Sequence, residues 1–292
     1  MTTQSFIITV HIVDYLKGQP LSPVDQILLS LGLVRMFLQV FSLFDAFLSL
    51  FFRHVFPVPA ILFLYLMSNA SNLSNIWLTT VFSVTFCLKI ANFHTALFLR
   101  LKATLSQQVV RLIVVSVLLS ICFISLFLWV DSKVNQAKEL QGHAINETEY
   151  LTHVYIFVAM GNSFPFIIYS SSTILLITSL FLHMRQMKSN ANVTANLDTY
   201  YEAIKFMSFC LLCFVLLVGT NVTVLHYYKS LDVIALFIFW NAFPTLHSIY
   251  LIYRTNKLRE HFLRILHRGT NGQVNGRNSE PKSRSQVETI SR

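Results

Sequence analysis

Two basic side chains, Arg35 and Lys89, lie inside long apolar stretches of this 292-residue sequence. A cation at the centre of a bilayer costs about 2.5–3.5 kcal/mol on insertion scales, so each of them needs a compensating interaction. Acidic residues are rare in these stretches, and Asp45 and Glu202 lie near their ends, so we do not expect an ion pair. Either the long stems reach the headgroups, or the cations face other helices and bond carbonyls, amides or hydroxyls. Both residues are predicted to act in helix packing and in conformational change.

The composition places these residues in a membrane protein. Hydrophobic residues make up 54% of the chain and charged residues 12%, about half the fraction typical of soluble domains. A helix needs about 20 mostly apolar residues to cross a bilayer. Six stretches are that long: about 24–48, 75–99, 109–130, 155–183, 201–228 and 232–253. The apolar stretch 43–67 is interrupted by Arg53, Pro57 and Pro59, so we expect it to form an outer loop.

Charge asymmetry predicts how the chain is oriented. Most of the 22 Lys and Arg residues fall on one side of the predicted spans, which is typical of the cytoplasmic side. This bias predicts an extracellular N-terminus and a cytoplasmic C-terminus, and therefore an odd number of crossings. The opening segment, residues 5–16, is too short to cross and resembles the last half of a helix. The predicted fold is all-α, a seven-transmembrane helix bundle with an incomplete first helix, and Asn146 in the outer loop 131–151 is a predicted glycosylation site.

The sequence does not favour catalysis or metal binding. Cys87, Cys122, Cys210 and Cys213 all lie in apolar stretches, and the spacing of Cys210 and Cys213 has no further ligands nearby. The ten His residues form no closely spaced pair, and no catalytic motif is present. We therefore expect no enzyme activity, no cofactor and no metal. The net charge of +9 follows from the inner-face bias, so no nucleic-acid partner is expected.

Five motifs occur in order along the chain. They are LSPVDQILLSLGLVR, which contains Leu31 and Arg35; LKIANF, which begins eleven residues after Trp77; FPFIIYSSSTILLITSLFLHMRQM; EAIKFMSF; and PTLHSIYLIYRTNKL. Together they resemble the bitter taste receptor family, taste receptor type 2. The chain departs from the family pattern at Val34, Cys87, His94 and Leu216. Thr3-Gln4-Ser5 stands about where the family has a glycine–asparagine element in its first helix.

The resemblance implies a G protein-coupled receptor of the plasma membrane. Its expected partners are small bitter agonists, a gustducin-like heterotrimeric G protein and membrane lipid. The family motifs imply structural or activation roles for Arg35, Lys89, Pro165, His183, Lys205, His247 and Ser248. The expected G protein contacts are Arg100, Lys102, Lys188 and Lys257. From position, and for Trp77 also from the resemblance, the expected ligand contacts are Trp77, Thr80, Val81, Phe164 and Trp240.

Two other classes remain as alternatives: a vomeronasal-type pheromone receptor, and a membrane transporter or channel subunit. The predicted domains are a receptor domain at 1–255, an amphipathic juxtamembrane helix at 256–268 and a disordered cytoplasmic tail at 269–292. The apolar face of the juxtamembrane helix, Leu258, Phe262, Ile265 and Leu266, is predicted to face lipid.

Overall fold

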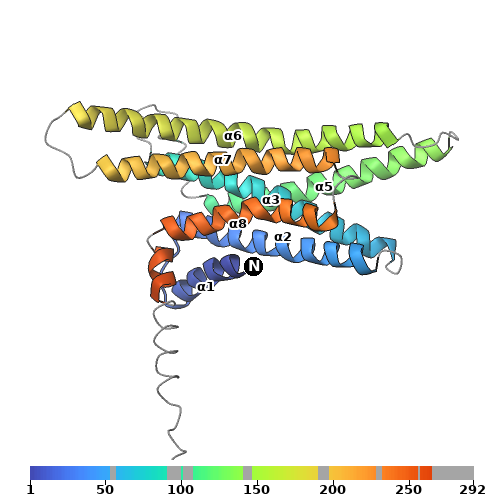
Figure 1. Cartoon of the computed structure of the whole chain (residues 1–292), viewed down its shortest axis with the longest axis horizontal. Coiled ribbons are helices and arrows are strands. Elements are labelled where there is room, and N and C mark those ends of the chain that lie inside the picture. The colour runs from blue at the N-terminus through green and yellow to red at the C-terminus, as the bar shows by residue number, and fades with distance from the viewer. Residues whose placement is uncertain are drawn as a thin grey trace, which may run out of the picture. The chain divides into compact units, whose positions relative to one another are not determined.

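A computed structural model describes residues 1–52, 57–90, 100, 108–140, 147–189, 197–227, 232–255 and 257–264. These residues are helical almost throughout (Figure 1). The helices are α1 (Thr2–Leu16), α2 (Pro23–Phe51), α3 (Val58–Ile90), α5 (Val109–Leu140), α6 (Glu147–Ser189), α7 (Leu197–Tyr227) and α8 (Val233–Arg254). Five helices contain spans long and apolar enough to cross a membrane: Pro23–Leu48, Pro59–Ile90, Val109–Val134, Thr152–Gln186 and Tyr200–Thr223. With 22 residues, α8 also has the length that a crossing needs. The predicted all-helical membrane fold is confirmed.

Residues Met1–Tyr250 form one compact unit. Within it α3 packs against α2, α5 and α6, while α6 also packs along α7 and α1 packs against α2 (Figure 1). A cluster of buried residues from α3, α6 and α7 forms the apolar core: Ile76, Tyr169, Phe214 and Leu217.

The second unit is Leu251–Arg292, which begins inside α8. Its described residues 257–264 are helical, with Leu258 buried and Phe262 exposed. Ile265, Leu266 and the predicted tail 269–292 lie outside the described residues.

The third predicted span was wrong at its start. We expected a loop over 43–67 and a helix from Asn75, but α2 continues to Phe51 and α3 begins at Val58. Pro59 is the second residue of α3, where a helix tolerates proline because its missing N–H would have no partner in the helix. The prolines therefore mark a helix start, and the candidate span ends at Ile90, with residues 91–99 outside the described residues.

The polar loop predicted over 131–151 was also partly wrong. The helix α5 continues to Leu140, and α6 begins at Glu147. The segment after Trp129 is polar but rich in Lys, Gln, Ala, Glu and Leu, which all favour helix, so α5 extends beyond its apolar span. Asn146 lies outside the described residues, and its glycosylation stays a prediction.

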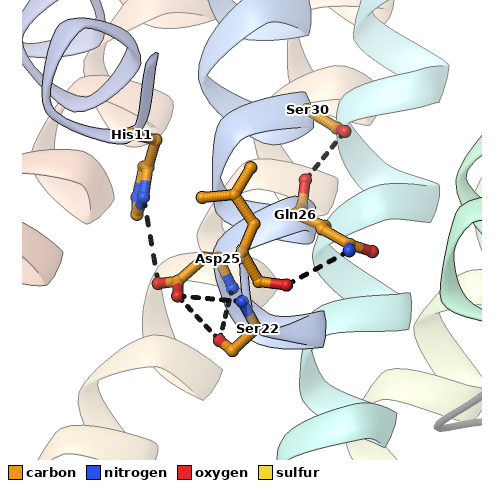
Figure 2. Close-up of polar contacts among 6 residues, drawn as sticks. His11, Ser22, Asp25, Gln26 and Ser30 are labelled. Carbon is orange, nitrogen blue, oxygen red and sulfur yellow. Dashed lines mark hydrogen bonds and ion pairs between the residues drawn. The ribbon is translucent and has the colours of Figure 1, made fainter. Parts of the chain in front are cut away.

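A capping box fixes the start of α2 next to α1. The Ser22 hydroxyl accepts a hydrogen bond from the Asp25 amide at 3.2 Å, and the Asp25 carboxylate accepts bonds from the Ser22 amide and hydroxyl at 3.3 and 2.8 Å. Figure 2 shows the buried His11 of α1 beside this cap, with Nδ1 at 3.8 Å from Asp25 Oδ1. Ser22 and Asp25 thus both cap α2 and place a carboxylate beside α1.

Hydroxyl groups join α3 to α6. Ser83 Oγ lies 2.8 Å from both Ser172 Oγ and Thr173 Oγ1. Thr80 Oγ1 lies 3.0 Å from the Ile76 carbonyl of its own helix and 3.2 Å from the Pro165 carbonyl of α6. Such bonds and close packing hold membrane helices together, since lipid removes the hydrophobic driving force between them.

Candidate functional site

The Arg35 guanidinium is the centre of a buried polar network. Its side chain comes from the middle of α2 and is 3% exposed. Nε donates to Asn75 Oδ1 of α3 at 2.8 Å. Nη1 donates to Ser248 Oγ of α8 at 2.6 Å and lies 3.1 Å from His247 Nδ1. Of the two alternatives predicted for Arg35, reaching the headgroups or facing other helices, the second is correct. Its side chain faces the bundle and bonds an amide and a hydroxyl.

Ser248 extends the network to α1. Its hydroxyl accepts bonds from Arg35 and from Gln4 Nε2, the second at 2.9 Å. It donates to the Pro244 carbonyl at 2.9 Å, and Gln4 Oε1 lies nearby as a weaker acceptor at 3.3 Å. With two acceptor lone pairs and one proton, a serine hydroxyl has no further capacity. Ser248 is fully buried, so every one of these bonds is inside the protein.

The tautomer of His247 follows from its partner. Arginine has only donors, so His247 Nδ1 must accept the bond from Arg35 and cannot carry a proton. The neutral ring then carries its proton on Nε2. That N–H is buried and has no hydrogen-bond partner among the described residues. His247 therefore presents one unused donor.

A small cavity of about 10 Å³ adjoins the network, room for about one water molecule. Arg35, Thr79, Cys213 and His247 are among its lining residues, together with apolar residues of α7 and α8 that include Phe214 and Phe243. The network and the cavity thus share Arg35 and His247.

The match to known proteins covers almost the whole chain. The family model described as "Taste receptor protein (TAS2R)" matches residues 1–270. The chain belongs to the taste receptor type 2 family. It is 28% identical to human taste receptor type 2 member 2 over 285 residues, 91% of each chain. It is also 28% identical to mouse taste receptor type 2 member 105 over 274 residues, 90% of each chain. Membership and the apolar helices support a multi-pass membrane protein of the receptor class, and they favour neither the vomeronasal nor the transporter alternative.

This taste receptor chain brings three of its predicted activation residues together: Arg35, His247 and Ser248. The sequence reasoning missed two partners, Gln4 and Asn75. Gln4 lies in α1, where its amide donates to Ser248 Oγ of α8. Asn75 is one of three asparagines in the mostly apolar helix α3, with Asn69 and Asn72, and the sequence does not single it out.

Lys89 differs from Arg35 in its surroundings. It lies in the last described turn of α3 and is exposed, whereas Arg35 is buried. The candidate span Pro59–Ile90 contains Lys89, as predicted, and residues 91–99 lie outside the described residues. Its role in activation stays a prediction.

The remaining predicted activation residues lie apart from the network. Pro165 is buried inside α6, where its carbonyl lies 3.2 Å from Thr80 Oγ1. His183, near the C-terminal end of α6, stacks on Tyr200 of α7 with ring centroids 5.3 Å apart. Lys205 is exposed and lies 3.4 Å from Glu202.

The five predicted ligand contacts do not surround one described cavity. Trp77 and Val81 are half-buried, while Thr80 is buried between α3 and α6. Phe164 is 68% exposed. The Trp240 indole N–H lies 3.3 Å from Asn221 Oδ1, which also lies 3.3 Å from Asn72 Nδ2. As agonist contacts, all five stay predictions.

The predicted G protein contacts are only partly visible. Arg100 is exposed, and Lys257 is half-buried in the helical segment 257–264. Lys188 belongs to α6, but its side chain is not described, and Lys102 lies outside the described residues.

Proposed function

We propose that this chain is a G protein-coupled receptor for bitter small molecules that signals through a gustducin-like heterotrimeric G protein. The observation that carries the proposal is the family match over residues 1–270. The relatives are named as taste receptors and align over about nine-tenths of this chain.

The proposed orientation puts the N-terminus outside the cell and the C-terminus in the cytoplasm, with the receptor in the plasma membrane. The bias of Lys and Arg supports it. A protease added to intact cells should leave a C-terminal tag uncut, and cleavage of that tag from outside would overturn the orientation.

The agonist site is proposed to include Trp77 on α3 and Trp240 on α8. Both rings are half-buried, and the Asn72–Asn221–Trp240 hydrogen bonds supply polar groups that can orient a ligand. Pockets of this kind combine aromatic walls with a few polar groups. With no acidic residue on the same part of α3, the preferred agonists are mostly apolar rather than amines.

The Arg35 network is the proposed element that changes between inactive and active states. It joins α1, α2, α3 and α8 through bonds that depend on the position of α8. An agonist that contacts α3 and α8 can shift this equilibrium only if it binds one arrangement more tightly.

A calcium-release assay tests the function. The full chain is expressed in cultured cells with a promiscuous G protein, exposed to a panel of bitter compounds, and compared with empty-vector cells. At least one compound should give a saturable response that depends on the receptor. Normal surface expression with no response to any compound would contradict the proposed ligand class.

A further inference from the structure

We infer that the cavity beside Arg35 and His247 binds a small single-atom anion, with chloride as the physiological example. The inference concerns a separate site from the proposed agonist pocket. It follows from three features of the described residues: an unbalanced buried charge, unused donors, and a cavity of suitable size.

The first feature is the charge. Arginine stays protonated in proteins, and Arg35 is buried. Its contacts among the described residues are with neutral groups: the Asn75 amide, the His247 ring and the Ser248 hydroxyl. The α2 carboxylates Asp25 and Asp45 are each ten residues away, about 15 Å along the helix axis. The lining of the cavity therefore carries a net positive charge that is not neutralised by any described carboxylate.

The second feature is the set of donors. The three contacts of Arg35 use Nε and Nη1, and the two N–H groups of Nη2 have no hydrogen-bond partner among the described residues. His247 adds its Nε2–H, which is buried and likewise unused within the described part of the chain. Cys213 adds a weak S–H donor to the lining. A site that combines a cation with several donors suits an anion better than a cation or a carbonyl group.

The third feature is size. A cavity of about 10 Å³ accepts about one water-sized particle. This volume favours water or a single-atom ion over the larger phosphate and sulfate ions. Chloride is somewhat larger than water, so it fits if the lining side chains shift slightly. The positive lining favours the halide, because the attraction between Arg35 and an opposite charge offsets part of the cost of removing that ion from water.

Thermal unfolding of the purified full-length receptor in detergent tests the inference. Sodium chloride is titrated against sodium gluconate at constant ionic strength, so that screening is unchanged and only the small anion varies. A ligand that binds the folded state stabilises it, and at ten times its dissociation constant the expected rise in Tm is about 3 °C and saturable. Equal Tm values across the titration would mean that the cavity holds water and would overturn the inference.

Two variants locate the effect. Cys213→Met fills the cavity without removing any bond of Arg35, so the chloride-dependent rise should disappear. Cys122→Met makes the same change at an exposed cysteine on α5 and should keep the full rise. Chloride dependence that persists unchanged in Cys213→Met would place the anion elsewhere and reject this site. The readout is stability without agonist, so failure here is independent of whether the chain responds to bitter compounds.

Discussion

Arg35 Nη1 and Ser248 Oγ lie 2.6 Å apart, although the two residues are separated by 213 positions in the sequence. This bond joins the middle of α2 to α8. Ser248 also accepts a hydrogen bond from Gln4 of α1, so the network reaches a third helix. Removing one partner of a buried charged group is costly, because the other partner keeps its charge and loses its solvation.

Replacement of Ser248 tests the importance of this bond. Ser248→Ala removes the acceptor used by both Arg35 and Gln4, so we expect a loss of about 1–3 kcal/mol in the free energy of unfolding. Thermal unfolding of the purified receptor measures it. The control is Ser163→Ala, because Ser163 is exposed and, among the described residues, its hydroxyl bonds the Ala159 carbonyl of its own helix and no other group. Equal small effects in the two variants would mean that the network does not stabilise the fold.

Close packing of α5 against α6 at Gly161 gives a second prediction. A Cβ atom at Gly161 would lie 2.8 Å from Phe123 Cε1, a contact that cannot occur without movement. We expect Gly161→Ala to destabilise the receptor by about 1–3 kcal/mol. Gly219→Ala is the matched control on α7, where a Cβ would meet nothing within 4 Å, and it should be neutral or slightly stabilising. Adding Phe123→Ala to Gly161→Ala should remove the clash, and a double variant with purely additive losses would contradict this explanation.

The three tryptophans allow a matched test of the proposed agonist site. For any compound that activates the receptor, Trp77→Ala should raise the half-maximal concentration about tenfold or more, which corresponds to about 1.4 kcal/mol. Trp240→Ala should have a smaller effect, partly through loss of the bond to Asn221. Trp129 is 60% exposed on α5, so Trp129→Ala should leave potency unchanged. Calcium release normalised to surface expression provides the measurement, and unchanged potency in Trp77→Ala would remove Trp77 from the site.

Charge reversal tests the proposed G protein contact. Lys188→Glu on α6 should lower G protein activation several-fold while surface expression stays normal, because like charges would then oppose the partner surface. Lys133→Glu, an exposed lysine of α5 on the proposed outer side, is the control. A parallel fall in expression and signalling for Lys188→Glu would assign the residue to topology or folding instead.

The sequence predicted the helices better than their ends. Apolar runs identified α2, α5, α6, α7 and α8, because a run of about 20 apolar residues is typical of a membrane-spanning helix. The start of α3 was missed because Pro57 and Pro59 were interpreted as loop residues, although proline is also common in a first turn. The polar end of α5 was missed because hydropathy detects the part of a helix that lies in the membrane and does not detect its polar extension into water.

For the Arg35 network, the sequence predicted the chemical type of the partners but not which residues they are. The scarcity of acids in the apolar stretches indicated neutral partners for Arg35, and these were found. Which amide and which hydroxyl would meet it depends on the packing of four helices, and no local pattern links Gln4 or Asn75 to a residue so distant in the chain. The exposed position of Phe164 likewise depends on the rotation of α6 against its neighbours.

The long sequence separation within the Arg35–Ser248 pair also matters during synthesis. Chains grow at about 5–20 residues per second, so Ser248 is made roughly 10–40 s after Arg35. Asn75 is made only 40 residues after Arg35. Until Ser248 and His247 are made, Asn75 is therefore the one direct partner of Arg35 in the network that has been synthesised. The nascent receptor therefore carries an incompletely bonded cation in the membrane until its last helix arrives. Chains that stop before α8 should keep that cation exposed, which makes them targets for quality control in the membrane where they are made.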